Sequence, residues 1–231
     1  MSRPLRICLP DLVYHILNRG NNRQAIFLSD EDYLHYLRIL SKYKKKFGFK
    51  IFAYCLMTNH VHLLIKTSIH GTVSQIVKAI TIAHTRRYHY RYQTSGHVWQ
   101  GRFKSPIVSD DEYLFALMRY IEQNPVRAGM VNHPEEYRFS SYHENSRKEA
   151  PVLTDRQDNP VFIGLGSTLT DCAQIYKEFA SALLEEDKLK LIRRSLGGQS
   201  HFASDKFIDQ IQTKIALSQK KHRGRPRRIN V

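Results

Sequence analysis

The sequence predicts an α+β fold, a ferredoxin-like or RRM-like sandwich in which an antiparallel sheet has helices on one face. The first observation is the order of the segments, whose side-chain patterns run β, α, β, β, α, β and then a further helix. The second is composition. Hydrophobic residues make up 42% and charged residues 25% of the 231 residues, a mix typical of a folded chain.

Four segments rich in β-branched, aromatic and aliphatic residues are expected to be strands. They span residues 12–18, 49–57, 60–66 and 102–108. Thr58 and Asn59 are expected to form a tight turn that joins the second and third strands into a hairpin. Pro106 lacks a backbone N–H, so the fourth segment should be an edge strand or a bulged one.

Three helices are expected, at residues 29–47, 72–92 and 109–123. Ser29 and Asp32 have the spacing of a capping box, in which the two residues satisfy each other's free backbone N–H groups at a helix start. Ser109 and Glu112 have the same spacing. The third helix should end at Asn124, because the residue before a proline is disfavoured in the helical region.

The amino-acid composition of the sequence changes after residue 146. Residues 148–170 are rich in proline and glycine, and the stretches 171–194 and 204–218 are expected to be helical. The last residues, 219–231, hold six Lys or Arg residues and no acidic one, so they cannot form a core. We therefore divide the chain into a first domain (1–146), a mostly helical extension (147–218) and a basic tail (219–231) that is expected to be disordered.

The charge balance favours a phosphate-bearing partner. Lys and Arg number 36 against 21 Asp and Glu, which gives a formal net charge of +15. Nucleic-acid-binding proteins have this character, but so do ribosome-associated factors and proteins that bind membrane surfaces. Charge alone leaves these classes open.

Cysteine usage and hydropathy indicate a cytoplasmic protein without a membrane segment. Cys8, Cys55 and Cys172 are far apart and form no CxxC pair, which favours reduced thiols over a disulfide framework or a zinc site. No stretch approaches the ~20 apolar residues that a membrane span requires. The first ten residues contain no apolar segment of the length found in secretory signals.

His60 and His62 form a candidate metal-binding pair. In a strand, residues two apart point to the same side, so both imidazoles should lie together while Val61 faces the core. Two such imidazoles can bind a metal if a third ligand comes from elsewhere. The chain has 12 histidines, so this pattern alone also fits a chance pair.

Tyr120 and Asn124 are four residues apart and should share one face of the third helix. Tyr120 lies at the border of that helix's apolar stripe, from where a phenol could reach into a cleft. Asn124 could offer its amide oxygen to a hard cation. With 13 tyrosines in the chain, the pattern by itself favours an ordinary tyrosine at the edge of the core.

Four motifs that follow one another along the chain favour a functional role for these residues. They are LNRGNNRQAIF (17–27), MTNHVHLLI (57–65), GHVWQGRFKS (96–105) and YIEQNPVRAGMV (120–131). Together they resemble the IS200-type tyrosine transposases, which belong to the HUH class, and most of all their REP-associated branch. The resemblance covers roughly residues 10–143.

The resemblance implies a site and an activity. His60 and His62 would be metal ligands, Tyr120 the nucleophile and Asn124 the third ligand, a position where the family has Gln or Asn. The metal would be Mg²⁺ or Mn²⁺, and the imidazoles suit Mn²⁺ better. The implied activity is nicking and rejoining of single-stranded DNA at hairpin or palindromic repeats through a 5′-phosphotyrosine.

Two other functions stay open. A hydrolytic metal-dependent nuclease could use the same histidines with water as the nucleophile. A non-catalytic, sequence-specific DNA-binding protein could act through the basic tail and basic patches. The resemblance also leaves the oligomeric state open. IS200 insertion-sequence enzymes work as dimers, whereas the long extension and the REP-type motifs favour a monomer.

Single-stranded DNA is usually held by basic grooves and aromatic stacking. The candidate DNA-binding residues are Arg19, Arg23, Trp99, Arg102, Lys104, Arg127, Arg225 and Arg227. Trp99 fits base stacking and packing at the end of the sheet equally well. Arg225 and Arg227 flank Pro226 in the tail, in a segment that resembles an AT-hook for the minor groove of A·T-rich duplex DNA but also fits a generic basic tail.

Overall fold

The computed structural model describes residues 8–108, 111–197 and 213. Within them, one sheet is formed by β1 (Val13–Arg19), β2 (Lys50–Met57), β3 (His60–Lys66) and β4 (Ile107–Val108). The strand order is β2-β3-β1-β4, and each neighbouring pair is antiparallel. β3 is thus inserted between β1 and β2, as in the split β-α-β unit of ferredoxin-like folds. This confirms the predicted α+β fold class.

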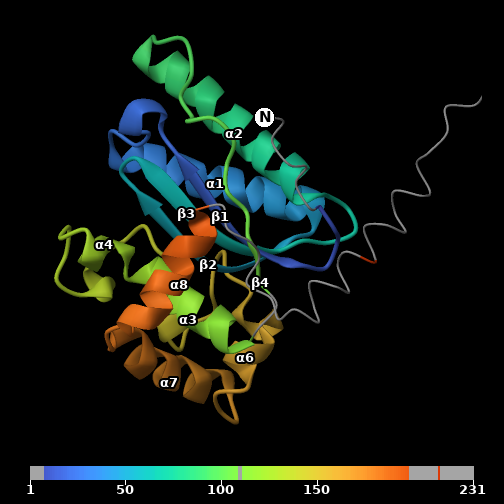
Figure 1. The fold of residues 1–231 in the computed structure, drawn as a ribbon, viewed down its shortest axis with the longest axis vertical. Coiled ribbons are helices and arrows are strands. Elements are labelled where there is room, and N and C mark those ends of the chain that lie inside the picture. The colour runs from blue at the N-terminus through green and yellow to red at the C-terminus, as the bar shows by residue number, and fades with distance from the viewer. Residues whose placement is uncertain (1–7, 109–110, 198–212, 214–231) are drawn as a thin grey trace, which may run out of the picture.

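Helices cover both faces of the sheet (Figure 1). α1 (Asp30–Phe47) and α2 (Val73–Tyr92) pack together on one face and form the layer that the sequence predicts. α3 (Asp111–Glu122) packs on β2 and β3 from the opposite face. Because both faces are covered, β2 and β3 are buried over nearly their whole length. Polar side chains in the middle of the α3 face, such as His15 and His62, are therefore shielded from water.

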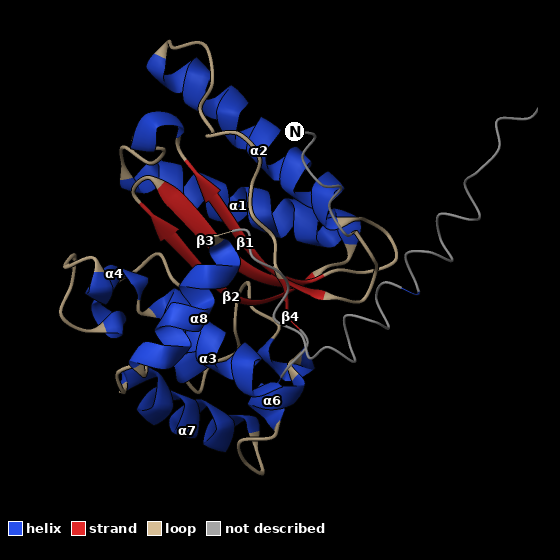
Figure 2. Ribbon diagram, viewed as in Figure 1, coloured by secondary structure: helices blue, strands red, loops and turns tan. Residues whose placement is uncertain are grey.

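The C-terminal extension surrounds α3 (Figure 2). After α3 the chain forms α4 (Asn124–Arg127), α5 (Tyr142–Ser146), α6 (Pro160–Ile163), α7 (Leu169–Ser181) and α8 (Glu186–Leu196). The short 3-10 helices are η1 (Asn21–Arg23), η2 (Pro134–Glu136) and η3 (Arg156–Asp158). Since α6, α7 and α8 all contact α3, the extension packs directly on the first domain. Across the described ranges, none of these helices has both the length and the apolar character needed to span a membrane.

The single helix expected over residues 171–194 is two helices in the structure. α7 ends at Ser181 and α8 begins at Glu186, with extended backbone at Ala182 between them. The break lets Leu184 be buried, at 7% exposure, although its neighbour Leu183 is 87% exposed. The division at residue 146 stays a prediction. The expected helix at 204–218 (apart from residue 213) and the basic tail with Arg225 and Arg227 lie outside the described residues.

The fourth strand is shorter than expected. Only Ile107 and Val108 form a ladder with β1, although the sequence predicts a strand from residue 102. The preceding segment still follows β1, through single bridges from Leu17 to Lys104 and from Gly20 to Trp99. Pro106 has no N–H to donate and contributes only its carbonyl, which accepts from the His15 N–H at 3.0 Å.

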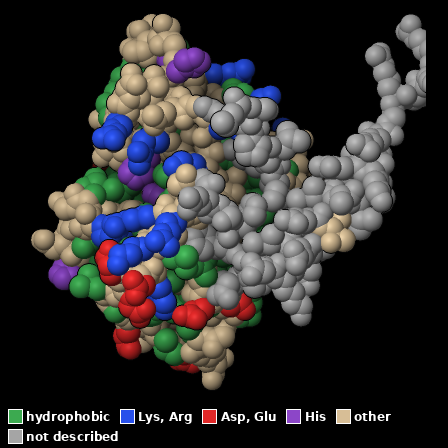
Figure 3. Space-filling model, in the orientation of Figure 1, with side chains coloured by type: hydrophobic (Ala, Val, Ile, Leu, Met, Phe, Trp, Pro, Cys, Tyr) green, Lys and Arg blue, Asp and Glu red, His purple; other side chains and the backbone are tan. Residues whose placement is uncertain are grey.

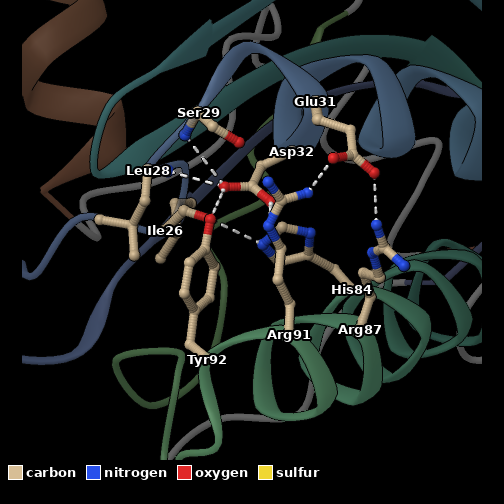
Figure 4. Close-up of polar contacts among 9 residues, drawn as sticks. All are labelled: Ile26, Leu28, Ser29, Glu31, Asp32, His84, Arg87, Arg91 and Tyr92. Atoms are coloured by element: carbon tan, nitrogen blue, oxygen red, sulfur yellow. Dashed lines mark hydrogen bonds and ion pairs between the residues drawn. The ribbon is translucent and has the colours of Figure 1, made fainter.

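An ion-pair cluster ties the start of α1 to the end of α2 (Figure 4). The Asp32 carboxylate accepts from the backbone N–H of Ser29, as the predicted capping box requires, and from the hydroxyl of Tyr92 at 2.6 Å. Arg87 and Arg91 of α2 both pair with Glu31. Exposed pairs of this kind add little free energy each, but they give the basic end of α2 a partner within the fold.

Candidate functional site

The pairing of β1 with β3 brings several chemically active side chains to the α3 face of the sheet. Arg19 is paired with His60 and Leu17 with His62. Since side chains alternate along a strand, His15 and Arg19 of β1 share a face with His60 and His62 of β3. The predicted common face for the two histidines is therefore present, and it is the face that α3 covers.

His62 is the centre of the cluster. Its Nδ1 lies 2.9 Å from Nε2 of His15, and the two rings stack with centroids 5.1 Å apart. The ring of His60 lies 5.2 Å from it, and the ring of Tyr120 meets it edge-on at 5.8 Å. The structure thus brings His60, His62 and Tyr120 together from a strand and a helix that are far apart in the sequence.

Burial keeps these histidines neutral. It lowers the pKa of His60 to about 4, with Arg19 adding to the effect, and the pKa of His15 to about 3. The pKa of His62 is held well below its usual value, first by burial and then by the neighbouring histidines. A neutral imidazole is the form that binds a metal, so His60 and His62 need lose no proton near pH 7.

The donor atoms of this site fit a divalent cation. The Nδ1 of His60 lies 2.6 Å from the Asn59 side-chain oxygen, and the Nδ1 of His62 faces His15, so the Nε2 atoms remain for a ligand. Asn124 donates its amide N–H to the Tyr120 carbonyl at 3.1 Å, which leaves its amide oxygen as an acceptor. Among the described residues no cluster of three His, Cys, Asp or Glu side chains suits a metal. The third ligand that the sequence predicts, the Asn124 amide oxygen, is of another type.

Tyr120 is buried on α3 beneath an arginine. Only 7% of it is exposed, and the guanidinium carbon of Arg127 lies 4.3 Å from the ring centroid. Burial raises the pKa of Tyr120, while Arg127, Arg193 and Arg19 oppose that rise. Burial also lowers the pKa of Arg127 to about 10, so it stays cationic near pH 7. A positive charge therefore lies over the Tyr120 ring and favours its anionic form.

Comparison with known proteins assigns this chain to a family. The family model described as "Transposase IS200 like" matches residues 8–124, about half of the chain, and this span includes the four residues of the predicted site. The chain belongs to the IS200-like transposase family. The resemblance inferred from the four motifs is thereby confirmed.

Two relatives agree with this assignment. A putative REP-associated tyrosine transposase of Haemophilus influenzae is 28% identical over 132 residues, which are 51% of this chain and 73% of the relative. The solved structure of a REP-associated tyrosine transposase bound to a REP hairpin superposes with a TM-score of 0.53 at 22% identity. That match covers 63% of this chain and 85% of the solved one, and it supports the fold.

His15 belongs to this cluster of side chains, although the sequence analysis did not include it among the candidate site residues. It is fully buried, hydrogen-bonded to His62, and its ring lies 6.2 Å from that of Tyr120. One signal was present: His15 and Arg19 are polar residues four apart in a strand otherwise rich in apolar residues, so they share a face. What they face depends on strand pairing, which the sequence does not show.

The C-terminal extension of this IS200-like transposase also reaches the site. α8 contacts α3, and Arg193 of α8 is close enough to act electrostatically on Tyr120 and Arg127. Lys and Arg side chains gather on this face over α8 and beside it (Figure 3). The extension thereby adds positive charge near Tyr120.

One of the six candidate DNA-binding residues of the first domain, Arg127, lies over the Tyr120 ring, and the other five fall into two groups. Arg19, Arg23, Arg102 and Lys104 are exposed. Two of the segments that carry them lie side by side, because the Gln100 N–H donates to the Arg19 carbonyl at 2.8 Å. Trp99, by contrast, is half-buried, with its Nε1–H donating to Thr85 at 3.1 Å and its ring packed on His84. This position of Trp99 favours packing at the end of the sheet over base stacking.

Proposed function

We propose that the chain is a metal-dependent DNA transesterase of the REP-associated type, with single-stranded or hairpin DNA as its substrate. The observation that supports this most is the juxtaposition of Tyr120 with the neutral His62 and the cationic Arg127. A nucleophile, a ligand pair and a fixed positive charge are the parts that phosphoryl transfer needs. The hairpin bound by the structural relative indicates the kind of DNA to test.

The proposed reaction exchanges one phosphodiester for another. The Tyr120 oxygen bonds to phosphorus, the bond from phosphorus to the DNA 3′ oxygen breaks, and the leaving oxygen takes a proton to become a free 3′-OH. The phenol proton passes to solvent. The 5′-phosphotyrosine keeps the energy of the original bond, so a second 3′-OH can reseal the strand without ATP.

The residues have distinct tasks in this proposal. IS200-like transposases generally use a divalent metal, and such an ion, when bound, withdraws charge from the phosphate and orients it. His60, His62 and Asn124 would hold the ion. Arg127 stabilises the anionic form of the Tyr120 oxygen, and exposed Arg19 meets the DNA backbone beside His60.

Denaturing gels of a covalent adduct test this proposal. The protein is incubated with a labelled single-stranded hairpin from the flanks of its own gene and Mn²⁺ or Mg²⁺. We expect a metal-dependent, SDS-stable band that disappears in Tyr120→Phe. Tyr113→Phe is the matched control, because Tyr113 is also buried and lies two turns earlier on α3.

Two results would replace the proposal. Cleavage that persists in Tyr120→Phe without any adduct would identify a hydrolytic nuclease that uses the same histidines. Binding of several hairpins without cleavage, unaffected by His60→Ala, would identify a non-catalytic DNA-binding protein. The elution volume of the protein on a sizing column with light scattering tests the accompanying proposal of a monomer.

A further inference from the structure

The buried contact between His15 and His62 assigns a role to a residue outside the ligand set. We propose that His15 is a positioning residue of the metal site: its Nε2 accepts the Nδ1–H of His62 and so reserves the Nε2 of His62 for the cation. The inference rests on the proposed function, because it assumes that His62 binds a metal. His15 itself is not a ligand in this account.

The contact is short, buried and held by the backbone. His15 Nε2 and His62 Nδ1 are 2.9 Å apart, and the two side chains are 0% and 2% exposed. β1 lies in the interior of the sheet between β3 and β4. The His15 N–H also donates to the Pro106 carbonyl at 3.0 Å. With water excluded and the backbone fixed, each imidazole determines the orientation of the other.

The hydrogen bond couples the tautomers of the two rings. Both imidazoles are neutral, so only one of the two hydrogen-bonded nitrogens, His15 Nε2 or His62 Nδ1, carries the proton that lies between them. If His15 Nε2 holds it, His62 carries its own proton on Nε2 and cannot bind a cation there. If His62 Nδ1 holds it, the Nε2 lone pair of His62 is free. Only the second arrangement is competent for metal binding.

The opposite side of His15 shows why the pair can adopt either arrangement. Its Nδ1 is buried and has no hydrogen-bond partner among the described residues. Ligating histidines usually donate to a carboxylate or a carbonyl, which can only accept. Here the acceptor is an imidazole with no fixed tautomer of its own. A cation bound at His62 would therefore favour the arrangement in which Nδ1 of His62 carries the proton.

Apolar packing does not account for His15. A side chain of the same shape without a nitrogen would fill the space but leave Nδ1 of His62 buried without a partner, which costs free energy. Gln is the informative replacement, because its side-chain oxygen lies about as far from the backbone as Nε2 of His and accepts a hydrogen bond. Phe retains the ring and removes the acceptor.

Mn²⁺ titrations of the intact protein, followed by electron paramagnetic resonance without DNA, test the proposal. We expect His15→Phe to weaken Mn²⁺ binding about 10- to 100-fold, the range found when partners of ligating residues are removed. His15→Gln should return the affinity to within a few-fold of the wild type. His84→Phe is the matched control, because His84 is equally buried but bonds the Ile26 carbonyl, away from His62.

A second measurement separates positioning from folding. In ¹⁵N-labelled protein with Mg²⁺, the imidazole nitrogen shifts should report a proton on Nδ1 of His62 in the wild type and in His15→Gln. Wild-type Mn²⁺ affinity in His15→Phe, or loss of affinity in all three variants in step with their melting temperatures, would overturn the role of His15. A wild type whose Mn²⁺ binding is absent, or unchanged by His62→Ala, would overturn the metal site of the proposed function and this inference with it.

Discussion

The guanidinium group of Arg127 lies over the ring of Tyr120, 4.3 Å from its centroid, and also donates to the Tyr120 backbone carbonyl. The cation and the phenol are both largely buried, so their interaction is weakly screened. Burial raises the pKa of Tyr120 and the positive charge opposes that rise. In the proposed mechanism, this pair determines how readily Tyr120 loses its proton.

Replacement of Arg127 by Met should slow adduct formation by about 100-fold near pH 7, the scale of losing one electrostatic partner of a developing anion. The pH–rate profile should move to higher pH, because the Tyr120 pKa rises further without the cation. Single-turnover adduct rates between pH 6 and 10 measure both effects. The matched control is Arg119→Met, since Arg119 lies over the Phe179 ring at 4.2 Å instead. An unchanged pH profile would remove Arg127 from the chemistry.

Acid should destabilise the fold between about pH 6.5 and 4. The pKa values of His15, His60 and His84 are lowered to about 3, 4 and 4 by burial. Between these pH values the histidines become protonated in the unfolded chain but stay neutral in the folded chain. The free energy of unfolding therefore falls as pH falls. Glu122 opposes the trend, since burial raises its pKa to about 7. Urea unfolding at pH 7.5, 6 and 5 checks the sign, and a constant midpoint would contradict it.

Glu122 should be needed to hold the extension on α3. Its buried carboxylate accepts from Ser141 at 2.5 Å, from Asn145 at 2.8 Å and from Tyr176 of α7 at 2.7 Å. Glu122→Ala removes the acceptor of the Tyr176 hydroxyl and of one Asn145 N–H, while Ser141 can still donate to the Tyr54 carbonyl, and should lower the free energy of unfolding by roughly 2–4 kcal/mol. Glu122→Gln keeps an acceptor without the charge and should lower the free energy of unfolding by a smaller amount. Denaturant unfolding compares the two, and equal losses would show that volume rather than hydrogen bonding matters.

Arg19 should contribute to DNA binding through charge. Arg19→Ala should weaken hairpin binding and reduce the slope of log affinity against log salt by about one. Lys78→Ala removes the same charge from an exposed position of α2, on the opposite face of the sheet, and should leave the slope unchanged. Fluorescence anisotropy across a range of NaCl concentrations measures both. Equal slopes for the two variants would exclude a contact at Arg19.

Much of the first domain could be predicted because its signals are local. β3 has the expected bounds of 60–66, α1 starts where the Ser29–Asp32 spacing indicates, and the two-residue alternation puts His60 and His62 on one face. These features depend on neighbours within a few residues. They are the kind of information that one sequence carries.

The remainder depends on tertiary structure. His15 and His62 are 47 residues apart in the chain, and only the register of β1 against β3 brings them together. The break between α7 and α8 follows from the burial of Leu184, which the helical periodicity of this stretch does not show. The proximity of Arg193 to Tyr120 likewise depends on how α8 packs on α3.

The most direct test is to identify the amino acid that becomes attached to DNA. The adduct formed with a hairpin and Mn²⁺ is digested with nuclease and protease, and the nucleotide-bearing peptide is sequenced by mass spectrometry. We predict a phosphodiester-linked nucleotide on Tyr120 through its 5′ phosphate, with a free 3′-OH on the released strand. A nucleotide on any other residue, or complete cleavage with every tyrosine unmodified, would contradict the account.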